Sequence, residues 1–164
     1  NFTDKEAAYF TALGTYLRPV SAVLAGFIAD KIAPTKTIFT LFAILGAAYT
    51  AILFATPSSV AVSIILTGLV VSFATVFALR GVYFALLEES NITRSETGIV
   101  VGLVSVIGYS PDIFFGPISG RILDASPGAE GHQAYFLLLT CFAVVGLCAI
   151  WLLIVSISKQ RTKI

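Results

Sequence analysis

Three ionisable side chains stand within long apolar stretches of the sequence: Arg18, Arg80 and Asp112. A charge in an apolar, membrane-like environment costs about 2.5 to 3.5 kcal/mol, so each of these residues needs a partner or a function. An arginine can hold an anion, because its planar guanidinium group stays charged. A carboxyl group can be kept protonated by desolvation and can release its proton when water enters. The chemistry to examine is therefore anion contact and proton transfer.

Arg18 lies near the middle of the first apolar stretch, twelve residues before Asp30. Twelve residues of helix are roughly 18 Å long, which places Arg18 close to the midplane of a bilayer. Pro19 follows it and can leave a backbone carbonyl without its helical partner. Two interpretations are open: Arg18 contacts a substrate anion in a central cavity, or it forms a structural ion pair between helices.

Asp112 lies near the middle of the fourth apolar stretch and follows the segment 109–111, whose sequence is Tyr-Ser-Pro. Its carboxyl group could couple a proton to transport, or pair with Arg18 at a similar depth, or line a polar cavity. We predict that Arg18, Tyr109 and Asp112 form the substrate-binding site.

Arg80 lies about twenty residues into the third stretch, towards its end, and Glu88 and Glu89 follow two turns later. A long cationic side chain near a helix end can reach the interface with its charged head. We predict that Arg80 is a structural charge, which acts as a latch or snorkels to the interface.

Five helices must position these residues. Hydrophobic residues make up 57% of the 164 residues and charged residues only 12%, against about 25% in a typical soluble domain. Each apolar stretch is near the length of about 20 residues that spans a bilayer. The stretches run over about 7–29, 37–55, 59–87, 97–123 and 134–158. The sequence therefore predicts an all-α, polytopic membrane bundle of five transmembrane helices, forming one domain over 1–164.

The positions of Lys and Arg predict the orientation of the helices, because cytoplasmic loops carry an excess of both. One side of the membrane receives Lys31, Lys36, Arg94, Lys159, Arg161 and Lys163. The other side receives Lys5, with Arg121 nearby inside the fourth helix. We expect a cytoplasmic C-terminus in the plasma or inner membrane, and external loops at 56–58 and 125–133.

The fourth stretch is rich in glycine, with the pairs Gly98/Gly102 and Gly116/Gly120 at a spacing that lets helices approach closely. Such contacts serve a bundle that rocks between two states, or static tight packing.

Other classes of function have little support in the composition. The net charge of +1 gives no broad field for nucleic acid. Cys141, Cys148 and His132 are too few and too far apart for a metal site. An enzyme within the membrane would need a nucleophile, a base or a metal cluster at that depth. The single His132 lies in a predicted loop and no paired carboxylates face each other within one helix, so we expect neither an enzyme nor a cofactor. The sequence has no Met, even at position 1, from which we expect a C-terminal piece of a longer protein.

The segment 26–31, Gly-Phe-Ile-Ala-Asp-Lys, resembles the G-x-x-x-D-R/K signature of the major facilitator superfamily. The resemblance implies that the five helices are helices eight to twelve of a transporter, whose missing N-terminal half is the main partner. It also implies that Gly26, Asp30 and Lys31 form a cytoplasmic gate. The segment 17–20 is similar to the eighth helix of nitrate/nitrite porters, which implies that Arg18 contacts the anion. An organic anion or another small solute is an equal alternative.

The predicted function is secondary active transport of a small solute by alternating access, with possible proton coupling. The alternative is a membrane scaffold or sensor that derives from a transporter and moves nothing. The expected partners are the solute and the lipid bilayer.

Overall fold

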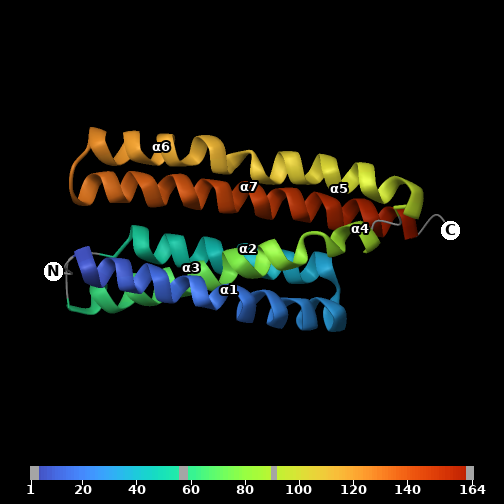
Figure 1. Ribbon diagram of the computed structural model, residues 1–164, viewed down its shortest axis with the longest axis horizontal. Coiled ribbons are helices and arrows are strands. Elements are labelled where there is room, and N and C mark those ends of the chain that lie inside the picture. Colours follow the sequence, from blue (N-terminus) through green and yellow to red (C-terminus); the bar gives the residue numbers. More distant parts are fainter. Residues whose placement is uncertain (1–3, 56–58, 90–91, 162–164) are drawn as a thin grey trace.

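The computed structural model describes residues 4–55, 59–89 and 92–161, and within these ranges it contains helices and short connections. The helices are α1 (Asp4–Ile32), α2 (Pro34–Leu53), α3 (Ser59–Val82), α4 (Ala85–Glu89), α5 (Arg94–Tyr109), α6 (Pro111–Ala125) and α7 (Ala129–Arg161). They run roughly side by side along the long axis of the molecule (Figure 1). The predicted all-α fold is confirmed.

Five helical segments of the described residues are long and apolar enough to cross a membrane. They are Ala8–Ile32, Pro34–Leu53, Val62–Val82, Ser95–Ala125 and Ala129–Lys159. The fourth consists of α5 and α6 together, which follow one another almost in line in Figure 1. The chain is therefore a multi-pass membrane protein. The loop expected at 56–58 and the basic residue Lys163 lie outside the described residues.

Two of the predicted stretches are interrupted. The third was expected to run to Leu87, but α3 ends at Val82 and the short helix α4 follows. At the interruption the amides of Leu86 and Leu87 donate to the carbonyls of Tyr83 and Phe84, three residues back instead of four. The fourth is interrupted at Ser110, where proline follows. Both interruptions lie in apolar sequence, so hydropathy alone does not reveal them.

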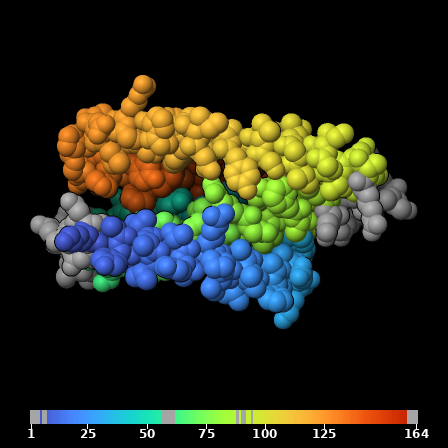
Figure 2. All heavy atoms as spheres, in the orientation of Figure 1, coloured from blue at the N-terminus to red at the C-terminus, as the bar shows by residue number. Residues whose placement is uncertain are grey.

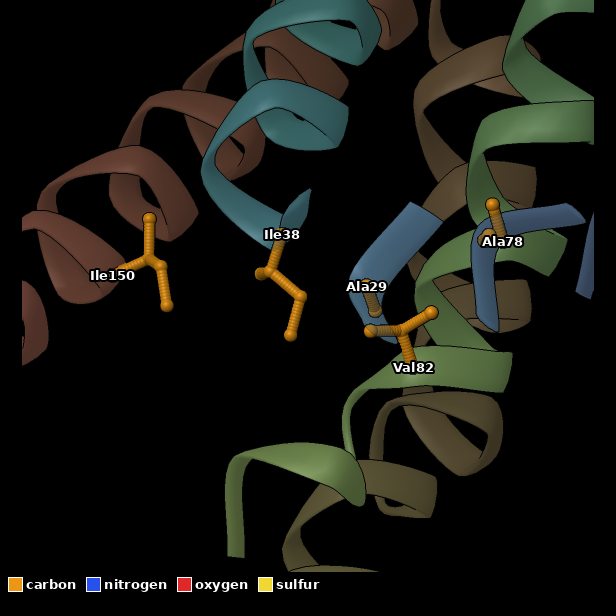
Figure 3. Close-up of a cluster of buried hydrophobic side chains, with 6 residues drawn as sticks. Ala29, Ile38, Ala78, Val82 and Ile150 are labelled. Carbon is orange, nitrogen blue, oxygen red and sulfur yellow. The ribbon is translucent and has the colours of Figure 1, made fainter. Parts of the chain in front are cut away.

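The packed part of the bundle is formed by α1, α2, α3 and α7. In it α1 lies against α3, and α2 lies against both α3 and α7. The buried side chains of the largest cluster come from all four helices: Ala25, Ala29, Ile38, Ala78, Val82 and Ile150 (Figure 3). Alanine at half of these positions brings the helix backbones close together, as small residues do in membrane bundles.

Glycine gives the closest approach between α1 and α3. A Cβ atom placed on Gly81 would lie 2.9 Å from the Cβ and 3.0 Å from the Cα of Ala22. The second distance involves the backbone of α1, which cannot move aside as the end of a side chain can. Only glycine therefore fits at this crossing without separating the helices.

The start of α2 is held by a residue from α4. Ala33 has a φ of 132°, a conformation that L-residues rarely adopt, and α2 has no side-chain cap of its own. The Glu89 carboxylate accepts the backbone N–H of Thr35 at 2.9 Å and its hydroxyl at 3.0 Å. Glu89 thus satisfies an amide in the first turn that would otherwise lack a partner. These bonds join the α1–α2 connection to α4.

The α5–α6 span is peripheral, and none of its described residues is buried. A Cβ atom added at any of its glycines would meet nothing within 4 Å: Gly98, Gly102, Gly108, Gly116 and Gly120. The close helix contact predicted for the two glycine pairs is therefore not made by the described residues. The visible face of the molecule is hollowed between this span and α1 (Figure 2).

Candidate functional site

An ion pair joins α3 to the start of α6. One terminal nitrogen of Arg80, Nη2, donates to both oxygens of Asp112, at 2.9 and 3.2 Å. The side chains are 41% and 57% exposed, so the pair is accessible from outside the bundle. Arg18 was one expected partner of Asp112, and Arg80 was expected near an interface. The structure instead pairs Arg80 with Asp112, because α3 brings Arg80 to the level of the interruption in the fourth span.

The interruption between α5 and α6 follows from Pro111. Proline has no N–H, so the Ile107 carbonyl loses its helical donor, and the Ser110 hydroxyl donates to that carbonyl at 2.8 Å instead. The Ile113 amide then donates to the Ser110 carbonyl, three residues back, at 3.1 Å. A new helix N-terminus begins here, and Asp112 lies in its first turn. The helix dipole favours a carboxylate at this position.

Two tyrosines complete the surroundings of Arg80. The guanidinium carbon lies 5.9 Å from the ring centroid of Tyr109, within the range of a cation–π contact. The hydroxyl oxygen of Tyr83 is buried and has no hydrogen-bond partner among the described residues. A buried hydroxyl without a partner is costly in an apolar environment. The Tyr109 phenol interacts with this hydroxyl, and because a phenol can both donate and accept, the group keeps capacity for a further hydrogen bond.

A pocket of about 480 Å³ opens beside the ion pair. Its walls come from α2, α3, α4, α5 and α7, and from Tyr83 between α3 and α4. The lining side chains are apolar except for Arg80 and the phenols of Tyr83 and Tyr109. The others are Ile38, Phe42, Leu79, Leu86, Val104, Ile107, Gly108, Gly146, Ala149, Ile150 and Leu153. The pocket thus combines a large apolar wall with one cationic corner.

The remaining predicted site residues lie elsewhere. Arg18 is exposed near the middle of α1, and no hydrogen bond or ion pair joins it to a described residue. Asp30 and Lys31 are exposed in the last turn of α1, and Gly26 has open space beside its Cα. The structure therefore brings together Tyr109 and Asp112 of the predicted set, and adds Arg80. The roles predicted for Arg18 and for the gate stay predictions.

The metal-binding side chains of the described residues are dispersed. Cys141 and Cys148 are exposed on α7, and Nδ1 of His132 lies 2.8 Å from the Gly128 carbonyl oxygen. No three His, Cys, Asp or Glu side chains gather in the described ranges in a way that could hold a metal ion.

Sequence reasoning missed Tyr83 and Glu89. Tyr83 occurs in an apolar run beside other aromatic residues, so nothing in the sequence marks its hydroxyl as unpaired. Glu89 was seen only as a possible neighbour of Arg80, although its partner Thr35 is 54 residues away in the chain. The one usable signal was the pair of possible helix breakers, Ser110 and Pro111, next to a carboxylate inside a span.

Two curated proteins are similar to this chain. It is 32% identical over 147 residues to inner membrane protein YihN of Escherichia coli, a match of 88% of this chain and 35% of that protein. It is 33% identical over 124 residues to inner membrane protein YqcE of the same organism, a match of 73% of this chain and 28% of that protein. The chain spans about a third of the length of these relatives.

These comparisons correct the resemblance to the major facilitator superfamily. No protein-family model and no solved structure matches the chain. The relatives carry the names of inner membrane proteins, and neither name identifies a transporter of that superfamily. The assignment of the five spans to helices eight to twelve, and the similarity to nitrate/nitrite porters, are wrong for the same reason. The comparisons support a membrane protein similar to YihN and YqcE.

Proposed function

We propose that the protein moves a small organic anion across the inner membrane. In this proposal the Arg80–Asp112 pair lies beside the path of the anion and controls the movement of α6. The observation that carries the proposal is this ion pair at the interruption of a membrane span. Ionisable residues within spans mark ion and solute pathways more often than they serve packing. Discontinuous helices are a recurrent feature of transport sites, because their ends offer partial charges to a solute.

The loose attachment of the α5–α6 span supports a movement. The described residues of the span are not buried, and it is joined to α3 by an ion pair that a competing charge can open. When Arg80 binds an incoming anion, its hold on Asp112 weakens and α6 is free to shift. Protonation of Asp112 would have the same effect, because a neutral carboxyl group no longer attracts the guanidinium. This gives alternating access a physical trigger and allows a proton to be coupled to it.

We place the C-terminus in the cytoplasm. The proposal rests on the excess of Lys and Arg at the end of α1, at the start of α2 and at the end of α7, which is typical of cytoplasmic segments. Arg18 is a second proposed contact for the anion, since an exposed arginine near the middle of a span requires water or a counter-charge.

Uptake by proteoliposomes that contain the full-length protein tests the function. The probes are radiolabelled lactate, benzoate and octanoate, supplied with and without an inward proton gradient. We expect at least one probe to enter faster than in empty liposomes. Arg80→Gln and Asp112→Asn should each reduce that rate at least tenfold, because each removes one partner of the trigger.

The matched control is Arg121→Gln, which removes an exposed arginine of α6 that makes no ion pair with a described residue. It should leave the rate within twofold of the unaltered protein. No uptake of any probe, or equal loss from all three variants, would contradict the proposal. A scaffold or sensor would give the first of these results.

A further inference from the structure

The pocket beside Arg80 has the size and the walls of a ligand site. Its volume of about 480 Å³ lies within the range of about 300 to 1,000 Å³ typical of small-molecule pockets. Side chains from α2, α5 and α7 form the apolar wall, among them Phe42, Val104 and Leu153. Such a wall favours a hydrocarbon body, since the removal of CH₂ groups from water stabilises the bound state.

The cationic corner of the pocket has donors to spare. A guanidinium group carries five N–H donors. Among the described residues the hydrogen bonds of Arg80 come from Nη2 alone, and both go to Asp112. The buried hydroxyl of Tyr83, which lines the same pocket, has no hydrogen-bond partner among the described residues. A ligand that reaches this corner therefore meets one cation and the phenols of Tyr83 and Tyr109.

We propose that this pocket binds an amphiphilic monocarboxylate, with its hydrocarbon body against the apolar wall and its carboxylate on Arg80 and Tyr83. The proposal rests on the proposed function and names the class of its substrate. A carboxylate oxygen can accept from the guanidinium and from the phenol together. The residues that line the pocket offer a cation no counter-charge, and an uncharged hydrocarbon would make no use of the Arg80 and Tyr83 donors.

The same geometry explains how the ligand would act on α6. A ligand carboxylate on the free donors of Arg80 shares the single positive charge with Asp112, so occupation of the pocket weakens the ion pair that joins α3 to α6. The binding of the apolar body is thereby linked to the release of the peripheral span. We expect a short anion without a hydrocarbon body to bind more weakly, because it makes no use of the apolar wall.

Binding is measured by calorimetry on the full-length protein in nanodiscs of phosphatidylcholine. The probes are octanoate, octanol and acetate, which separate the charge from the hydrocarbon body. Octanoate should bind at least tenfold more tightly than either of the others. Equal binding of octanol would overturn the proposal, since the carboxylate would then contribute nothing.

A membrane lipid is the other source of an anionic amphiphile. Nanodiscs that contain phosphatidylglycerol, followed by native mass spectrometry, distinguish the two sources. Displacement of any retained lipid by octanoate supports the proposal. A phosphatidylglycerol molecule that octanoate cannot displace would overturn it, because the occupant would then be a structural lipid.

Two tryptophan variants of α5 locate the site. Val104 lines the pocket, whereas Val106 is 71% exposed and does not line it. Val104→Trp should weaken octanoate binding at least tenfold by filling the pocket, and Val106→Trp should change it less than twofold. Arg80→Gln should remove the preference for octanoate over octanol. Equal effects of the two tryptophan variants on octanoate binding would show that octanoate does not bind in this pocket.

The proposed function and the proposed substrate class can be contradicted by different results. If other anions are transported with dependence on Arg80 while octanoate does not bind, the substrate class is wrong and the function stands. If octanoate binds with dependence on Arg80 but no probe is transported, the function is wrong. In that case the pocket is a binding site only.

Discussion

The contact between α1 and α3 and the α5–α6 span both contain glycines, but they use them differently. Gly81 lies against Ala22, so close that no larger residue fits. Gly102 and Gly116 of the other region have open space beside them. The first region is held by buried apolar surface, and the second has no buried residue in its described part. Small residues permit close packing, but they do not by themselves bring a partner.

The two regions also differ in what joins them to the bundle. Burial of side chains from four helices cannot be undone by one ligand. The α5–α6 span lies along α7 without burying any of its described residues, and its specific contacts include the Arg80–Asp112 pair and the edge-to-face contact of Phe115 with Phe142, whose ring centroids are 5.6 Å apart. Such contacts are worth only about 0.2 to 1.5 kcal/mol each. A region attached in this way can move while the packed region keeps its shape.

The largest effect on the free energy of unfolding is expected when valine replaces a packed glycine, compared with valine at an open one. Gly81→Val should lower the free energy of unfolding by about 1 to 3 kcal/mol, because the new side chain meets the backbone of α1. Gly102→Val should change it by less than about 0.5 kcal/mol, since the position is open. Thermal unfolding of the full-length variants in detergent measures both. Equal losses would show that the α5–α6 span is packed as tightly as α1.

The next effect concerns the bond that holds the start of α2. Glu89→Ala should cost about 0.5 to 2 kcal/mol, because the Thr35 amide loses its acceptor. The matched control is Glu96→Ala at the exposed start of α5, where Glu96 accepts the Thr93 hydroxyl at 2.6 Å. That loss should be a few tenths of a kcal/mol, roughly the value of an exposed pair. Thermal unfolding measures both losses. A larger loss from Glu96→Ala than from Glu89→Ala would contradict the prediction.

A smaller effect is expected from opening the ion pair. Asp112→Asn should raise the rate of hydrogen exchange of the α6 amides by up to about fivefold, which corresponds to about 1 kcal/mol. The amides of α2 should exchange at an unchanged rate, because α2 is held by burial. Mass spectrometry after exchange measures the deuterium taken up by the amides of α6 and α2. Acceleration in α2 as well would mean that the regions do not move independently.

The smallest effect is expected at the interruption itself. Ser110→Ala should cost about 0.5 kcal/mol, because the Ile107 carbonyl loses the hydroxyl that replaces the missing N–H of Pro111. Ser119→Ala is the control, since its hydroxyl makes a similar bond to the Phe115 carbonyl, 2.7 Å away, within an uninterrupted helix. That change should cost less, as a helical carbonyl keeps its backbone donor. Thermal unfolding of the two variants measures the difference.

Local sequence predicted the spans well, because the free energy of transfer into a bilayer is a sum over neighbouring residues. The five spans and the unusual carboxylate beside Pro111 follow from composition and spacing alone. The candidate site was predicted only in part. Tyr109 and Asp112 were included and Arg80 was predicted as a structural charge, whereas Tyr83 was not considered.

The sequence by itself determined that the chain is a helical membrane protein, and that Arg18, Arg80 and Asp112 lie in apolar surroundings. The tertiary structure decided which arginine meets Asp112, because the lateral order and tilt of helices depend on side chains far apart in the chain. It also decided which glycines lie in a contact. Both decisions arise from packing between helices, which a pattern of neighbouring residues does not record.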